Sequence, residues 1–273
     1  MPFWKHRDYF RVVHLFRAKP LSPALGEYYV CFIDLMGQKE FFEKIDSETP
    51  DLETLRHVTR VSEGLCEIVR YVENRYARVF SCADDAGVEL FSDSVMLSIK
   101  AGPDMREKLA AWLGVIVKVV YIACKYELPF RGGIASGSAS CSKSGSIYGE
   151  AVDRAMQIES ECADYPRVVL SYKLIDAFKN DERLSMYFDV DTDSAYVLDY
   201  AGPRLMKRPE FARECKALEG MNEWVLSLYK RYCFTGENEH DKVANPKLAR
   251  RYVMWLDYLR MAEFYRMRNV QDT

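Results

Sequence analysis

Residues 28–37 read YYVCFIDLMG, an apolar run that ends in a single carboxylate, Asp34, and a glycine. β-Branched and aromatic residues dominate this run, which is typical of a buried strand. A second stretch with an aspartate among apolar residues lies at 90–97 and reads LFSDSVML. Its Ser-Asp-Ser between two short apolar runs predicts a tight hairpin with Asp93 at its tip. A carboxylate at the end of a buried strand is costly unless a cation or hydrogen bonds compensate it. We therefore predict a two-aspartate metal site on a β-sheet, the alternatives for each aspartate alone being a helix N-cap after Asp34 and a turn residue at Asp93.

The composition is that of an ordinary globular protein. The chain has 273 residues, of which 49% are hydrophobic and 29% charged, and a net charge of −3 that gives no electrostatic reason to expect a nucleic-acid partner. None of the 8 cysteines forms a C-x-x-C pair, and the 4 histidines are too scattered for a zinc site. No apolar segment is long enough to span a bilayer, and the basic, aromatic N-terminus lacks the apolar core of a signal peptide. We expect a soluble, cytoplasmic protein with reduced thiols.

Hydrophobic spacing and proline positions divide the chain into three parts. We expect an N-terminal arm at 1–25, a core domain at 26–202 and a C-terminal helical extension at 203–273, since Pro203 and Pro209 break the pattern. The alternation of strands and helices predicts an α+β sheet rather than a doubly wound one. Within the core domain we expect strands at 28–34, 129–137, 167–170, 186–190 and 195–199, a hairpin at 87–99, and helices at 37–45, from Asp51, from Pro103 and at 149–163; the extension holds helices at 210–232 and 247–267.

Four segments, in this order, resemble those of the class III nucleotide cyclases. They are FIDLMG at 32–37, FSDSVML at 91–97, FRGGIASG at 130–137 and YGEAVDRAMQIE at 148–159. The resemblance spans about residues 28–200 and is greatest to the pyrimidine nucleotide cyclases of the bacterial Pycsar anti-phage systems. It implies a ferredoxin-like catalytic domain, with an antiparallel sheet that carries helices on one face, followed by the C-terminal helices.

The resemblance also implies a metal site. Asp34 and Asp93, with the backbone carbonyl of Leu35, would bind two Mn²⁺ or Mg²⁺ ions, and hard cations of this kind prefer oxygen ligands. The metals would lower the pKa of the ribose 3′-hydroxyl and neutralise the leaving pyrophosphate. The implied site is shared between the two chains of a homodimer.

This chain departs from the purine cyclases on the helix after the glycine-rich strand. Where they carry Asn and, four residues later, Arg, this chain has Asp153 and Gln157. We expect Gln157 and Arg131 in the catalytic role and Arg131 and Arg154 as sources of positive charge for the phosphates; the alternatives for the arginines are a structural ion pair and solvent exposure.

Two further residues are candidates for the base. Glu89 stands four residues before Asp93, where adenylyl cyclases carry Lys and guanylyl cyclases Glu, and this disfavours adenine. Its carboxylate can accept from uracil N3–H, the cytosine amino group or guanine. Tyr29 is a candidate for stacking on the base, with core packing as the alternative.

The resemblance thus implies a uridylate cyclase that makes 3′,5′-cyclic UMP and pyrophosphate from UTP. The product would be a second messenger in antiviral defence, read by a separate cyclic-nucleotide effector protein. Three alternatives stay open: a cytidylate cyclase, a guanylate cyclase, and a catalytically dead module that only binds a nucleotide or a partner.

Overall fold

The computed structural model describes residues 24–36, 51–80, 86–141, 146–212, 218, 220–233 and 246–271. Residues 1–23 of the predicted arm and the predicted helix at 37–45 lie outside the described residues. Residues 24 and 25, which we assigned to the arm, already belong to the first strand. Within the described residues, no helix is long and apolar enough to cross a membrane.

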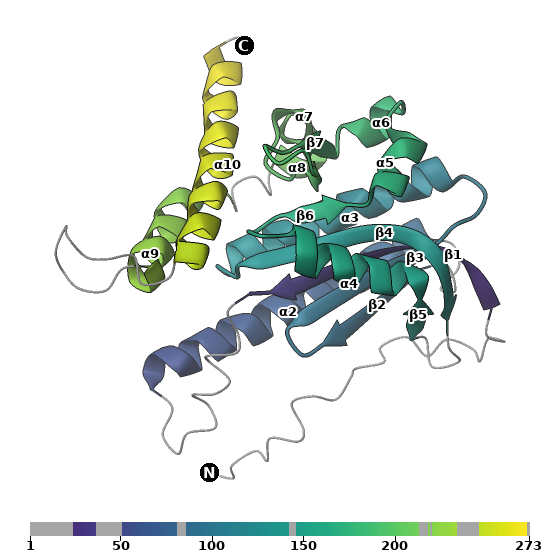
Figure 1. Ribbon diagram of the computed structural model, residues 1–273, viewed down its shortest axis with the longest axis horizontal. Helices are drawn as coiled ribbons and strands as arrows, with labels where there is room; N and C mark the ends of the chain where they lie inside the picture. Colours follow the sequence, from purple (N-terminus) through teal and green to yellow (C-terminus); the bar gives the residue numbers. More distant parts are fainter. Residues whose placement is uncertain are drawn as a thin grey trace.

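One sheet forms the centre of the molecule (Figure 1). Its strand order is β2-β3-β1-β4-β6-β8-β7, with β5 paired to β4 outside this path. Neighbouring strands run antiparallel except β4 and β6, which pair in parallel among the strands described. The predicted α+β class with a mostly antiparallel sheet is therefore confirmed. The strands are β1 (Ala24–Leu35), β2 (Ala86–Phe91), β3 (Ser94–Lys100), β4 (Phe130–Cys141), β5 (Ile147–Gly149), β6 (Val168–Leu170), β7 (Phe188–Val190) and β8 (Tyr196–Leu198).

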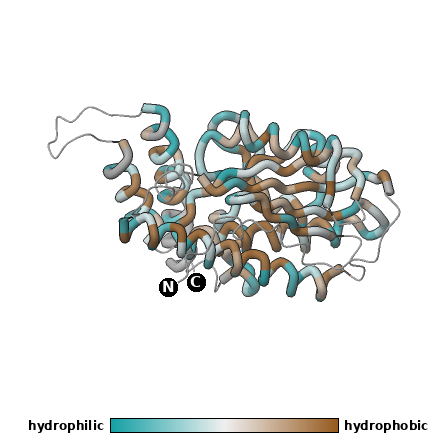
Figure 2. Tube along the Cα trace, turned by 90° about the horizontal axis from the view of Figure 1, so that it is seen from below, coloured by the Kyte–Doolittle hydropathy of each residue, from teal (hydrophilic) through white to brown (hydrophobic). Residues whose placement is uncertain are grey.

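Helices cover both faces of this sheet, which corrects our expectation of helices on one face. Side chains alternate along β1, so that Cys31 and Ile33 pack into the core under α2 and α3, whereas Val30 and Phe32 pack on the other face with α4. The apolar run of β1 follows from this, because a strand buried on both faces needs no polar side. Figure 2 shows that the strands in the middle of the molecule are largely hydrophobic. The core helices are α2 (Leu52–Val79), α3 (Met105–Lys125), α4 (Glu150–Cys162), α5 (Tyr172–Phe178) and α6 (Glu182–Ser185).

Local signals set the helix boundaries. Asp51 has extended backbone angles and accepts a hydrogen bond from the Thr54 N–H at 2.6 Å, so Asp51 is the N-cap of α2 and the predicted start of this helix is confirmed. Helix α4 lies directly on β4, since a Cβ on Gly133 would come within 2.1 Å of the Ala155 carbonyl oxygen. Only glycine allows this close approach.

The C-terminal extension is helical, as expected, and packs against the core domain. Trp255 of the last helix is fully buried, donates from Nε1 to the Tyr200 hydroxyl at 3.0 Å, and makes an edge contact with the Phe130 ring. The extension comprises α7 (Pro203–Met206), α8 (Pro209–Ala212), α9 (Met221–Cys233) and α10 (Pro246–Gln271).

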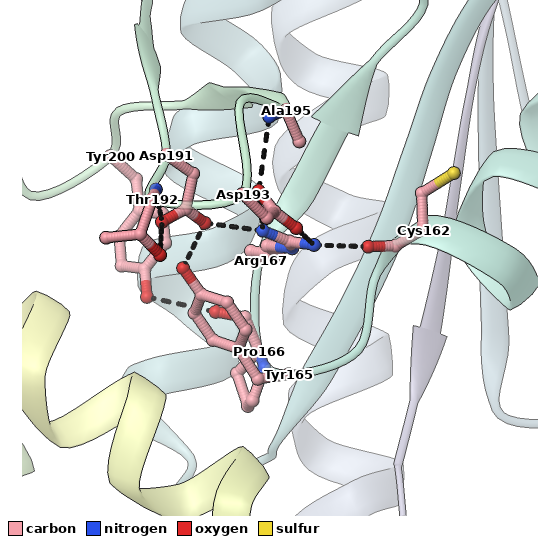
Figure 3. A network of polar contacts seen from close by, with 9 residues as sticks. All are labelled: Cys162, Tyr165, Pro166, Arg167, Asp191, Thr192, Asp193, Ala195 and Tyr200. Atoms are coloured by element: carbon pink, nitrogen blue, oxygen red, sulfur yellow. Dashed lines mark hydrogen bonds and ion pairs between the residues drawn. The ribbon is translucent and has the colours of Figure 1, made fainter.

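A buried arginine fixes the edge of the sheet (Figure 3). Arg167 is 3% exposed, pairs with Asp191 and Asp193 of the β7–β8 turn, and donates to the Cys162 carbonyl at the end of α4. The Tyr165 hydroxyl also donates to Asp191. Because these acceptors satisfy the guanidinium on several sides, the cluster is a structural clamp that joins α4, β6 and the β7–β8 turn.

Candidate functional site

Strand pairing brings Asp34 and Asp93 together at one end of the sheet. Asp34 lies opposite Ser94 in the β1–β3 register, and Asp93 is in the two-residue turn just before Ser94. The Leu35 N–H donates to the Asp93 carbonyl oxygen at 3.1 Å, which ties the end of β1 to the hairpin. Ser92 takes φ of 57° in this turn, a conformation that tight hairpins require. The predicted hairpin with an aspartate at its tip is thereby confirmed.

The two carboxylates interact electrostatically. Burial raises the pKa of Asp93, and the negative charge of Asp34 raises it further. Asp34 itself is about three-quarters buried and accepts a hydrogen bond from Ser94 Oγ at 2.9 Å. Two hard oxygen donors that repel each other fit a divalent cation. No group of three or more His, Cys, Asp or Glu side chains suited to a metal occurs in the described part of the chain, so a metal here would complete its shell with backbone oxygens, water or substrate phosphates.

Arg131 lies beside the aspartates in the same chain. It stands opposite Asp34 in the β1–β4 register, with its Nε 3.5 Å from Asp34 Oδ2. The same nitrogen also forms an ion pair with Glu159 of α4. Glu159 is 5% exposed, and burial raises its pKa to about 7, with the charge of Arg131 opposing and that of Asp34 adding to the shift. Arg131 is thus a cation shared between two carboxylates at the site.

The site contains two residues that our sequence reasoning missed. One is Glu159, which the sequence alone shows only as one of several acidic residues of an amphipathic helix. The other is Arg251 of α10, whose positive charge lowers the pKa of Glu159. One turn of helix separates Arg251 from Trp255, which contacts Phe130 next to Arg131. A small cavity of about 80 Å³ at this point is lined by Asp164, Lys247, Arg250, Arg251 and Met254.

Arg154 and Gln157 lie elsewhere. Both are on the solvent side of α4, where Arg154 pairs with Glu150 at 2.6 Å and Gln157 Nε2 donates to Glu161 at 3.1 Å. Neither side chain contacts Asp34 of its own chain, as far as the described contacts show. Within one chain, the described contacts of these two side chains are with other residues of α4 and not with the aspartates.

The two candidates for the base are separated by the sheet. Glu89 shares a face with Asp34, because it pairs with Met96, which pairs with Phe32. It is 9% exposed and accepts from the Ile147 N–H at 2.8 Å. Tyr29 lies on the opposite face, buried in the main core with its ring 6.2 Å from that of Phe178. This placement favours core packing for Tyr29 over stacking on a base at Asp34.

No family model matches the chain, and no curated protein matches it either. Among solved structures, it is similar to the catalytic core of a rhodopsin-guanylyl cyclase with converted specificity in complex with ATPalphaS, at 13% identity and a TM-score of 0.44, covering 65% of this chain and 98% of that one. It is also similar to the guanylyl cyclase domain of the RhoGC fusion protein from the aquatic fungus Blastocladiella emersonii, at 15% identity and a TM-score of 0.43, covering 65% of this chain and 98% of that one. A third similar structure is that of a bacterial light-regulated adenylyl cyclase, at 14% identity and a TM-score of 0.43, covering 74% of this chain and 59% of that one. Identities this low do not transfer an activity, so the function of this chain rests on its own residues.

Proposed function

We propose that this chain is a metal-dependent nucleotide cyclase that converts UTP into 3′,5′-cyclic UMP and pyrophosphate. The observation that carries the proposal is the meeting of Asp34, Asp93 and Arg131 at one end of the sheet. Two carboxylates for divalent cations beside a fixed guanidinium are the groups that a triphosphate needs. The quoted segments that resemble class III cyclases supply each of these three residues.

The reaction joins the ribose 3′-oxygen to the α-phosphorus while the bond from that phosphorus to the β-phosphate oxygen breaks, and the 3′-hydroxyl proton leaves. Two Mn²⁺ or Mg²⁺ ions, held by Asp34, Asp93 and the Leu35 carbonyl, would supply charge neutralisation and acidify the 3′-hydroxyl. Arg131, oriented by Glu159, is placed to hold a phosphate oxygen beside the aspartates. Arg251 adds positive charge on the same side. Most of the rate enhancement would come from positioning and electrostatics.

Two observations bear on the choice of base. Glu89 lies on the face of Asp34, and one of its carboxylate oxygens accepts from the Ile147 N–H at 2.8 Å. A carboxylate there disfavours adenine and accepts from uracil or cytosine. The preference for a pyrimidine rests on the resemblance to the Pycsar cyclases, as does the proposed signal to a separate effector in anti-phage defence, and UTP is placed before CTP because we expect uridylate cyclases to be the commoner members.

We also propose a homodimer with shared sites. Arg154 and Gln157 project from the outer side of α4, away from Asp34 of the same chain. Exposed apolar side chains occur on this side of the sheet, with Phe91 43% and Met156 45% exposed. A two-fold arrangement that covers them would bring α4 of one chain to the aspartates of the other and would form two equivalent sites.

The test is to incubate the purified protein separately with each of the four nucleoside triphosphates and Mn²⁺, and to identify the products by mass. We expect cyclic UMP as the main product, with CTP the next best substrate and GTP third. Asp34→Asn and Asp93→Asn should each abolish turnover, because each removes a charged metal ligand.

Other products would contradict the proposal. Cyclic GMP or cyclic AMP as the dominant product would overturn the pyrimidine assignment. No product from any nucleotide, with binding retained, would favour the catalytically dead module, for which Asp153 and Gln157 in place of Asn and Arg are the structural argument.

A further inference from the structure

A second cavity lies in the helical layer on the other face of the sheet from Asp34. Its volume is about 570 Å³, within the usual range of small-molecule sites. It opens between the end of α2, the middle of α3 and the start of the C-terminal extension. None of the residues that line it belongs to the site described above. The lining residues are Tyr71, Asn74, Arg75, Arg78, Ala110, Ala111, Gly114, Lys118, Tyr187, Arg208, Glu210 and Phe211.

The rim of this cavity is basic. Among the described residues that line it, four side chains are cationic and one is a carboxylate, Glu210, which pairs with Arg208 at 2.9 Å. Arg75 and Arg78 are exposed near the end of α2, and no ion pair joins either to a carboxylate in the described part of the chain. Positive charge without a matching carboxylate at a concave surface attracts anions. Lys118 adds a third cation on α3.

The wall of the cavity is aromatic. Tyr187 and Phe211 are 4% and 2% exposed, and their rings meet edge to face at 6.3 Å. Lys118 Nζ lies 5.8 Å from the centre of the Phe211 ring, and the charge of Arg75 reaches the Tyr187 hydroxyl, whose pKa it lowers against the larger effect of burial. Cations and ring surfaces therefore border the same space, which suits a ligand that has both an anionic group and a flat apolar one.

A glycine in the middle of a helix keeps this space open. A Cβ on Gly114 of α3 would lie 3.3 Å from the Tyr187 hydroxyl and 3.6 Å from Phe211 Cζ, so any side chain there would press on the two rings that line the cavity. Glycine in a helix interior costs about 1 kcal/mol relative to alanine. The helix carries this cost at the position where it lies beside both rings.

We propose that this cavity is a second nucleotide-binding site, in which Arg75 and Arg78 hold the phosphates and the base lies against Tyr187 and Phe211. The site is separate from the Asp34–Asp93 site and needs no divalent metal, because arginine rather than carboxylate provides its phosphate contacts. Its place across α2, α3 and α8 links the core domain to the C-terminal extension.

The test measures binding of ATP and UTP by calorimetry to the full chain in EDTA, which suppresses a metal-dependent site. We expect binding by the wild type and by Asp34→Asn, and at least a tenfold loss of affinity in the double variant Arg75→Glu/Arg78→Glu. Arg56→Glu is the matched control, because Arg56 is an exposed arginine of the same helix, about 28 Å away along its axis. It should bind like the wild type.

Two further measurements test the role of the rings. Gly114→Ala should weaken nucleotide binding severalfold, since its Cβ would displace the Tyr187 ring that lines the cavity. Inorganic tripolyphosphate should bind more weakly than ATP. Equal binding of tripolyphosphate and ATP, undiminished binding by the double variant, or no nucleotide binding by the wild type would each overturn the proposal. Binding of a Glu-rich peptide in place of nucleotides would reassign the cavity to a protein partner.

Discussion

Asp93 is a charged side chain that the fold holds under two unfavourable influences, burial and the neighbouring charge of Asp34. Both raise its pKa above the value in the unfolded chain. The folded protein therefore binds this proton more tightly than the unfolded chain does, and metal-free protein loses stability as the pH rises through the raised pKa. The same repulsion is what a divalent cation would relieve.

We accordingly expect Asp93→Asn to raise the melting temperature of the metal-free protein at pH 7, by roughly 1–3 °C for a chain of this size. The gain should vanish near pH 3, where Asp93 is protonated in both folded and unfolded states. Melting curves in EDTA over this pH range provide the measurement, with Asp176→Asn, an exposed carboxylate distant from the site, as the control. A lower melting temperature at pH 7 would mean that the Asp93 charge stabilises the fold, contrary to the repulsion argued here.

At the scale of the element, strand β1 shows what sequence reasoning could and could not predict. A strand over residues 28–34, its apolar character and the aspartate near its end were predicted correctly, because they depend on local residue types, whereas the start of β1 at Ala24 was not predicted. The sequence also allowed the faces of the strand to be assigned. Side chains an odd number of residues apart point to opposite faces of a strand, and Tyr29 is five residues before Asp34, so Tyr29 had to lie on the face opposite Asp34. The unbroken apolar run likewise indicated cover on both faces, which we did not infer.

The groups missed at the site come from elements far apart in the sequence. Glu159 reaches Arg131 because α4 lies on β4, and this depends on the close approach at Gly133. Arg251 comes close to Glu159 because Trp255, one helical turn later on α10, packs against Phe130. Neither the docking nor the resulting charge pairing leaves a periodic or short-range signal. Sequence patterns predict elements, whereas such side-chain neighbours follow only from tertiary packing.

The docking of α10 also involves a buried carboxylate, Asp199, just after β8. It is 6% exposed and accepts a hydrogen bond from the Tyr258 hydroxyl at 3.1 Å, while that hydroxyl accepts from the Ala201 N–H. Burial raises the pKa of Asp199 to about 6. Because this pKa exceeds that of the unfolded chain, Asp199 costs stability as the pH rises from about 4 to above 6.

We predict that Asp199→Asn stabilises the protein at pH 8 by about 2 kcal/mol, since the amide oxygen can still accept from Tyr258 and no charge is buried. The gain should decline below pH 6 and disappear near pH 4. Urea unfolding at several pH values measures it, and Asp176→Asn, at an exposed carboxylate of α5 that does not act on Asp199, serves as the comparison. Equal stability of variant and wild type at pH 8 would show that Asp199 is not held at a raised pKa.

At the scale of the whole molecule, the structure divides the proposed catalytic groups into two sets. Asp34, Asp93 and Arg131 meet within one chain, so Arg131 belongs with the aspartates rather than with groups supplied by a partner. Arg154 and Gln157 project from the far side of α4. A homodimer that shares its sites would combine the first set of one chain with the second set of the other.

Mixing two inactive variants tests this division. Asp34→Asn lacks a metal ligand, and the double variant Arg154→Ala/Gln157→Ala lacks the outer groups of α4, so each alone should show little activity. After random exchange, half of the dimers are mixed and each mixed dimer has one intact site of two, so about a quarter of the wild-type activity should return. Mixing Asp34→Asn with Arg131→Ala should restore nothing, because both changes affect the same set of groups. Exchange of subunits is verified with differently tagged chains. Activity recovered in the second mixture, or no activity recovered in the first after exchange, would refute this division of the shared site.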